Sequence, residues 1–240
     1  MNYNWNWSIL FQEPYFDWIL SGLGWTVAVA LSAWVIAFTL GSVIGVMRTV
    51  PSKAARSFAT AYVELFRNVP LLVQMFLWYF ALPEVLPDDA GRWLKRDLPN
   101  PEFVTAFVAL GFYTASRVAE QVRAGIESIP KGLNNAAKAS GLSTYQTYRH
   151  VLLPISFRIV IPPLTSEFLT IFKNSSLALT IGLLELTGRT QQITEYTFQG
   201  FEAFAAATVL YVIIALIVTL TMTWVEGRTR IPGYIGAGKR

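Results

Sequence analysis

Two long runs without a charged residue, 23–47 and 203–225, constrain the fold more than any other feature of the sequence. At about 1.5 Å per residue, a helix over the first run is about 37 Å long, which is enough to cross a bilayer core of about 30 Å. Charged residues make up 14% of the chain, whereas a soluble domain usually carries about 25%. The sequence therefore predicts an integral membrane protein.

Further apolar stretches are interrupted by polar residues, and the last of them contains Pro162 and Pro163. Taken together, the sequence predicts an all-α, polytopic membrane helix bundle of about five transmembrane helices. The expected spans lie within a domain over 22–226, at about 22–47, 57–82, 103–121, 158–184 and 203–225. In the first span, Gly41 and Gly45 have a spacing that lets helix backbones approach closely.

The distribution of basic residues indicates the orientation. With the N-terminus outside, the cytoplasmic segments carry twelve of them and the outer loops four, as the positive-inside rule predicts. The basic residues of the cytoplasmic segments explain the net charge of +4, so a nucleic-acid-binding surface is not needed to account for it. The expected outer parts are a Trp- and Tyr-rich interfacial segment 1–21 and an irregular, solvated loop 83–101, and the expected cytoplasmic parts are a loop 123–154 and a tail 227–240.

The cytoplasmic loop 123–154 carries clear local signals. A helix that begins near Lys131 can end at Gly141, because glycine suits a left-handed C-terminal cap. Ser143 can then cap the N-terminus of a second helix, and Gln146 completes a capping box with it. The loop is therefore predicted to be two short helices joined by a tight turn.

Ala136 and Ala137 keep one face of the first of these helices thin, so a partner protein can approach its backbone closely. An amphipathic loop that lies on the membrane surface is an alternative that stays open. A DNA-binding helix-turn-helix is rejected, because the loop is tethered between membrane spans and has no soluble core to support a recognition helix.

Three blocks of sequence resemble the polar amino acid permeases of bacterial ABC importers. Asn135-Ala136-Ala137, Gly141 and Val151-x-Leu153-Pro154 match the EAA loop of binding-protein-dependent permeases at every spacing, with Asn in place of the usual Glu and Val in place of the usual Ile. Residues 62–74 and 173–177 resemble the family's motifs in its second and a later span. The similarity covers about 22–226 and is closest to glutamate/aspartate importer permeases.

The resemblance implies a type I ABC importer permease in a bacterial inner membrane, with a periplasmic N-terminus and a cytoplasmic C-terminus. It implies partner ATPase subunits, a second homologous permease in a heterodimer, and a periplasmic amino-acid-binding protein. The residues that it assigns to ATPase coupling are Asn135, Ala136, Ala137, Gly141, Leu153 and Pro154.

The sequence lacks the residues that other functions need. It contains no G-x-x-x-x-G-K-[ST] phosphate loop, so ATP is expected to be used by a partner subunit and not by this chain. It has no cysteine and one histidine, His150, so no metal site is expected. We identify no set of nucleophile, base and orienting group, so we expect no enzyme active site and no cofactor.

Polar residues at membrane depth are the candidates for a substrate path, because exposing them to lipid costs several kcal/mol. They are Glu64, Arg67, Asn68, Glu167, Lys173 and Asn174. Glu64 and Arg67 share a helical face and can pair, either inside the bundle or as a structural clasp near the cytoplasmic interface. Glu167 and Asn174 share a face of the fourth span, which Pro162 and Pro163 can bend or break.

Two other functions remain as alternatives. A self-sufficient secondary transporter or channel for polar solutes would move its substrate without an ATPase, although five spans cannot divide into two equal inverted repeats. A non-transporting membrane anchor would tolerate polar substitutions at Glu167 or Lys173.

Overall fold

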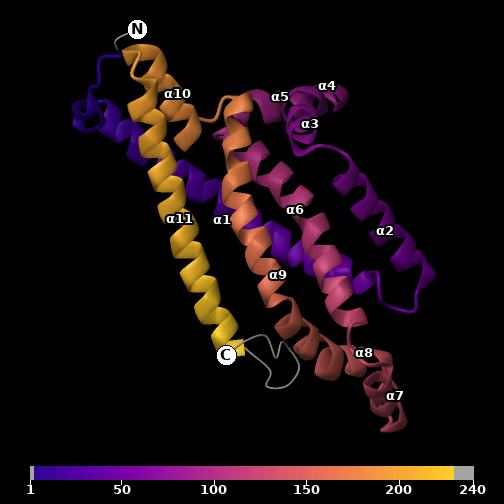
Figure 1. The fold of residues 1–240 in the computed structure, drawn as a ribbon. Helices are drawn as coiled ribbons and strands as arrows, with labels where there is room; N and C mark the ends of the chain where they lie inside the picture. The colour runs from indigo at the N-terminus through magenta and orange to yellow at the C-terminus, as the bar shows by residue number, and fades with distance from the viewer. Residues whose placement is uncertain (1–2, 230–240) are drawn as a thin grey trace.

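The computed structural model describes residues 3–229, and these residues form helices and turns without a strand, as the all-α prediction requires. The predicted tail 227–240 lies outside the described residues from position 230 onward. Long helices run along the bundle (Figure 1). They are α1 (Tyr15–Met47), α6 (Pro101–Glu127), α9 (Leu153–Asn174) and α11 (Gly200–Thr229).

Shorter helices complete the described fold. They are α2 (Lys53–Asn68), α3 (Leu71–Phe76), α4 (Leu82–Val85), α5 (Asp88–Arg92), α7 (Lys131–Ala139), α8 (Thr144–Thr147) and α10 (Leu186–Thr197). Figure 1 shows α3, α4, α5 and α10 at the end near the N-terminus, and α7 and α8 at the opposite end. The end near the N-terminus is called the outer end below, and the end that carries α7 and α8 is called the inner end, after the predicted orientation.

Three helices of the described chain are long and apolar enough to cross a membrane: Tyr15–Met47, Gly200–Thr229 and a continuous helical stretch, Thr144–Ile181. α6 is also long enough, with 27 residues, but Arg117, Glu120 and Arg123 make its second half polar. α6 packs along α1 and against α9, and these three charged side chains form ion pairs with one another or with residues of neighbouring helices.

The predicted span 57–82 is not one straight helix. The segment breaks into α2 and Leu71–Val85, which meet at an angle of 101°. Pro70 causes the break, because it has no N–H to donate and holds the preceding Val69 in an extended conformation, with φ of −98° and ψ of 127°. The polar end of α2, with Arg67 and Asn68, thus lies at a corner of the chain.

The outer loop over 83–101 was predicted to be irregular, and this prediction is wrong. The segment folds into α4, α5 and a π-helical turn at Trp93–Asp97. An ion pair between Lys95 and Glu84 joins the turn to α4, and Arg92 pairs with Asp89 at 2.6 Å. These local pairs, with the acidic first turn of α5, stabilise short helices that hydropathy alone does not reveal.

Glycines set the distance between α1 and α6. A Cβ atom at Gly41 would lie 2.7 Å from the carbonyl oxygen of Ala115 and 2.7 Å from the Cβ of Val118. One turn further, a Cβ at Gly45 would lie 2.7 Å from the carbonyl oxygen of Ala119. The close approach that this glycine spacing permits is therefore made within the chain, between two of its own helices.

We expect Gly41→Ala to destabilise the protein by about 1–3 kcal/mol, because the added methyl group must push apart two packed backbones. The measurement is thermal unfolding of the purified protein in detergent. Gly24→Ala is the matched control in the same helix, since a Cβ there has no heavy atom within 4 Å. Equal melting temperatures for the two variants would contradict the proposed packing.

Candidate functional site

The turn between α7 and α8 is fixed by a left-handed glycine, as the sequence predicts. Gly141 has a φ of +84°. Its N–H donates to the carbonyl oxygen of Lys138 at 3.0 Å, and the N–H of Leu142 donates to that of Ala137 at 3.2 Å. This pair of hydrogen bonds is a Schellman motif, which satisfies the last carbonyls of α7.

The capping box that begins α8 is also confirmed. The N–H of Gln146 donates to Oγ of Ser143 at 3.3 Å, and the N–H of Ser143 donates to Oε1 of Gln146 at 2.8 Å. Both motifs use residues within six positions of one another in the sequence. The loop geometry is therefore locally determined.

The α7–α8 loop presents a mixed surface at the end of the bundle. Asn135, Ala136 and Gly141 are exposed, and Tyr145 is 67% exposed. The second alanine differs from the expectation, because Ala137 is buried and packs inward. The thin outer face of α7 therefore depends on Ala136 and not on both alanines.

The α7–α8 loop leads into α9 without a break in the helix. α8 continues through a π-helical turn, Tyr148–Leu152, into α9, with Leu153 half-buried and Pro154 exposed in its first turn. Pro162 and Pro163 lie inside α9 without interrupting it, so the expected break is absent. α8 and α9 thus belong to one continuous helical stretch, Thr144–Ile181.

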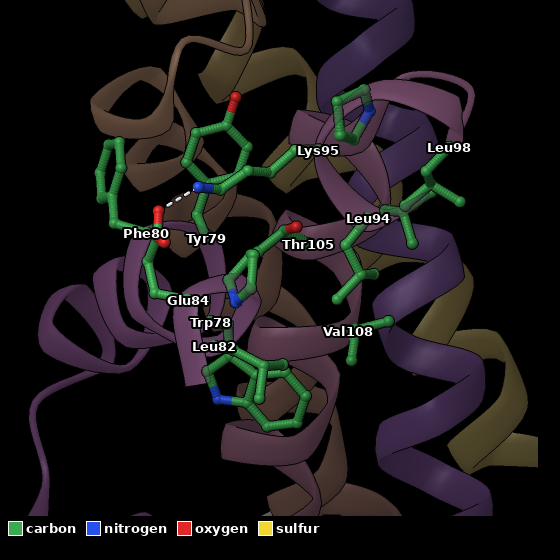
Figure 2. A pocket seen from close by; sticks show the side chains of 13 residues that line it. Trp78, Tyr79, Phe80, Leu82, Glu84, Leu94, Lys95, Leu98, Thr105 and Val108 are labelled. Atoms are coloured by element: carbon green, nitrogen blue, oxygen red, sulfur yellow. Dashed lines mark hydrogen bonds and ion pairs between the residues drawn. The ribbon is translucent and has the colours of Figure 1, made fainter. Parts of the chain in front are cut away.

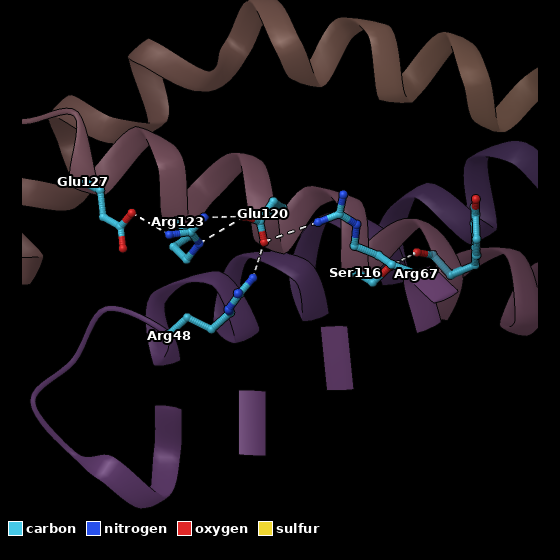
Figure 3. A network of polar contacts seen from close by, with 7 residues as sticks. Arg48, Arg67, Ser116, Glu120, Arg123 and Glu127 are labelled. Atoms are coloured by element: carbon cyan, nitrogen blue, oxygen red, sulfur yellow. Dashed lines mark hydrogen bonds and ion pairs between the residues drawn. The ribbon is translucent and has the colours of Figure 1, made fainter. Parts of the chain in front are cut away.

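A cluster of charges binds the inner parts of α1, α2 and α6 (Figure 3). Glu120 on α6 pairs with Arg48 and Arg123, and its Oε2 is 3.6 Å from Nη1 of Arg67. Arg123 also pairs with Glu127 at 2.5 Å. The expected pair of Glu64 with Arg67 is absent among the described residues, because Arg67 points to Glu120 and Glu64 is exposed.

A second ion pair joins α6 to α9. Nε of Arg117 donates to Oε2 of Glu167 at 2.6 Å, and Nη2 donates to Oε1 at 3.0 Å. The Glu167 side chain is 6% exposed and that of Arg117 is 41% exposed. Two parallel hydrogen bonds make this a bidentate pair, which fixes the relative orientation of the two helices.

The other candidates on α9 lie at its C-terminal end. Lys173 is exposed and Asn174 is half-buried. Lys173 borders a cavity of about 500 Å³ between α9 and α11, which Phe172, Tyr211 and Ile214 also line. The six candidate path residues therefore do not form one cluster: those on α2 lie at its corner and those on α9 follow one helix.

Sequence reasoning missed Glu185, the N-cap of α10. Its carboxylate accepts hydrogen bonds from the N–H groups of Thr187 and Gly188 at 3.0 and 2.9 Å, and from the hydroxyls of Tyr211 and Thr26 at 2.9 and 3.2 Å. Burial raises the pKa of Glu185, and the two N–H groups oppose that rise. The sequence gives little signal for it, because glutamate is not among the preferred N-cap residues and its partners on α1 and α11 are distant in sequence.

An apolar cavity of about 390 Å³ lies at the outer end, between the π-helical turn at Leu77–Ala81 and the start of α6. Figure 2 shows Trp78, Leu94 and Val108 around it, with the Glu84–Lys95 ion pair beside it. Among residues 3–229, no group of His, Asp and Glu is placed to hold a metal ion.

The fold and its sequence define the class of this protein. Residues 37–231 match the model of a family described as binding-protein-dependent transport system inner membrane components, and the chain belongs to this family. It is therefore an integral component of an inner-membrane transport system.

Its relatives include amino acid permeases. The chain is 46% identical to the glutamate/aspartate import permease protein GltJ of Escherichia coli strain K12, over 98% of the chain and 99% of the relative. It is 34% identical to the probable glutamine ABC transporter permease protein GlnM of Bacillus subtilis strain 168, over 93% and 97%. A solved structure, described as an amino acid ABC transporter with histidines, matches with a TM-score of 0.79 at 26% identity, over 94% and 100%.

We expect Glu120→Gln to lower the free energy of unfolding by about 2 kcal/mol, because it leaves the arginines without their shared counter-charge. Arg48 is affected most, since its side chain is only 14% exposed. The measurement is denaturant unfolding in detergent micelles. The control Glu127→Gln removes a pair whose carboxylate is 52% exposed and should change stability by less than about 0.5 kcal/mol. Similar losses from both variants would refute a special role for Glu120.

Proposed function

We propose that this chain is the permease subunit of an ATP-driven importer for an acidic amino acid, glutamate or aspartate. The substrate class follows from the 46% identity to an import permease for these amino acids across nearly the whole chain. The observation that carries the mechanism is the uninterrupted helical path from α8 to the end of α9.

In this proposal, a pair of ATPase subunits binds α7 and α8 from the cytoplasm and uses the ATP, and the chain itself needs no cofactor. Asn135, Ala136 and Gly141 offer an exposed docking surface, while Leu153 and Pro154 connect it to α9. Closure of the ATPase pair moves α8, and α9 carries the motion into the membrane. The N-terminus is periplasmic and the C-terminus cytoplasmic, consistent with the distribution of basic residues.

The substrate path runs between this chain and a second, homologous permease in a heterodimer, and a periplasmic binding protein delivers the amino acid. Lys173 is the cation best placed to attract a carboxylate, since it is exposed at the end of α9 and borders a cavity. Glu167 has a different role in this scheme, because Arg117 already neutralises it and the pair holds α9 against α6.

Reconstituted uptake tests the proposal. The complete complex in liposomes, with binding protein outside and ATP inside, is expected to accumulate radiolabelled glutamate only while ATP is hydrolysed. Uptake by this chain alone, driven by an ion gradient, would instead support a self-sufficient transporter and overturn the proposal.

We expect Gly141→Asp to insert and fold but to uncouple ATP hydrolysis from uptake. A Cβ at this exposed position meets no heavy atom within 4 Å, and the left-handed backbone costs a side chain about 1–2 kcal/mol. The added carboxylate, however, must lose its hydration against a docked ATPase. Uptake at a fixed ATPase rate is expected to fall at least about tenfold, the effect of a 1.4 kcal/mol loss in docking.

Gly141→Asn is the matched control, because it has nearly the same shape and tolerates the left-handed conformation but carries no charge. It is expected to retain most of the uptake. Normal transport by the Asp variant would show that the α7–α8 loop is not the docking surface.

A further inference from the structure

A second, open pocket lies at the inner end of the bundle, where the connection from α1 to α2 meets the end of α6 and the start of α7. Its volume is about 580 Å³, and its lining includes Arg48, Arg56, Arg123, Lys131, Glu127 and Tyr148. Pockets of about 300–1,000 Å³ accommodate small ligands. The space is therefore sufficient for a small polar group.

Positive charge is in excess in this pocket. Its lining contains four cationic side chains and one carboxylate, that of Glu127. Glu120 binds Arg48 and Arg123 from beside the pocket, together with Arg67. Within residues 3–229, Arg56 and Lys131 have no carboxylate within 4.0 Å, and Arg56 donates a hydrogen bond only to the carbonyl oxygen of Val50, at 3.1 Å. Two cations thus remain available to an anion.

The pocket also lies at the level where a helix leaves the membrane. Arg48 is the C-cap of α1, the first apolar helix, and α2 begins at Lys53. α2 exposes large apolar side chains, with Phe58 62% and Leu65 63% exposed, beside the exposed Arg56 and Glu64, a mixture typical of a helix at the boundary between lipid and water. Headgroups of the surrounding bilayer can therefore reach the mouth of the pocket. Basic pockets at the cytoplasmic ends of membrane helices favour anionic lipid headgroups.

We propose that this pocket binds the phosphodiester headgroup of an anionic phospholipid from the cytoplasmic leaflet. The assignment of the leaflet rests on the orientation in the proposed function. Arginine side chains suit phosphate oxygens because they can donate two parallel hydrogen bonds.

The bound headgroup would connect a fixed part of the bundle to the α7–α8 loop. Arg48 and Arg56 belong to the α1–α2 connection, whereas Lys131 is the first residue of α7. The hydroxyl of Tyr148 already donates to Oγ1 of Thr49 at 3.1 Å across the same gap. A phosphate between these cations strengthens this link, so the content of anionic lipid sets how firmly the loop is held.

An outer pocket shows what distinguishes the inner one. It has a volume of about 460 Å³ and is lined by Arg92, Lys95 and Arg96 together with Glu84 and Asp88. Lys95 is paired with Glu84, and Arg92 with Asp89. Two of its three cations are thus paired within the protein and two carboxylates line it, so it has less excess positive charge and supplies a control at the opposite end of the bundle.

The test is a binding measurement on the full chain, assembled with its partner subunits in a neutral detergent. Dihexanoyl phosphatidylglycerol, dihexanoyl phosphatidylcholine and inorganic phosphate are titrated separately and followed by microscale thermophoresis. We expect phosphatidylglycerol to bind at least about tenfold more tightly than the other two. The double variant Arg56→Gln, Lys131→Gln should weaken its binding at least about tenfold, since each cation contributes about 1 kcal/mol, while Arg96→Gln should not.

Equal binding of phosphatidylcholine would overturn the proposal, and so would an unchanged affinity in the double variant. Inorganic phosphate that binds as tightly as phosphatidylglycerol would identify a free-anion site and overturn the assignment to lipid. None of these titrations requires ATP or transport. A complex that binds the lipid but does not take up glutamate would therefore refute the proposed function and leave this proposal intact.

Discussion

The close contact between α1 and α6 determines where the other functional groups lie. Because Gly41 and Gly45 have no side chain, the α1 backbone packs directly on Ala115 and Ala119 of α6. This contact brings the end of α1 beside Glu120, so that one carboxylate serves arginines from three helices. At the same level as the glycine contact, between Ala115 and Ala119, α6 also presents Arg117 to Glu167 of α9. The ion pairs between helices thus depend on the close spacing that the packing of α1 on α6 creates.

The α9 helix runs from the α7–α8 loop at the inner end to Lys173 at the outer end. It receives α8 without a break, is held to α6 by a bidentate ion pair near its middle, and ends near Lys173 and the cavity beside α11. In the proposed importer, this arrangement makes α9 the element that links ATPase docking to the substrate path. Glu185 secures the outer side, because its carboxylate joins the start of α10 to Thr26 of α1 and Tyr211 of α11.

The sequence predicted those features that are set by neighbouring residues. The left-handed Gly141, the Ser143–Gln146 capping box and the uncharged spans each follow from a short segment, so a single sequence reveals them. The partners of Arg67 and Arg117 could not be predicted, because Glu120 and Glu167 lie on other helices and reach them only after packing. The bend at Val69–Pro70 was predictable in principle from the restriction that proline places on the residue before it, but 57–82 was predicted as a single span.

The two prolines inside α9 affect how easily this helix bends. Pro162 and Pro163 lack the amide hydrogens that would bond to the carbonyls of Arg158 and Ile159, one turn earlier. Between the α7–α8 loop and Lys173, α9 therefore bends more easily at the two prolines than elsewhere. In the proposed importer, the part of α9 before Pro162 can tilt with a bound ATPase subunit, while the Arg117–Glu167 pair beyond it resists rotation. In that scheme α9 carries the motion of α8 mainly as a change in the angle of the helix.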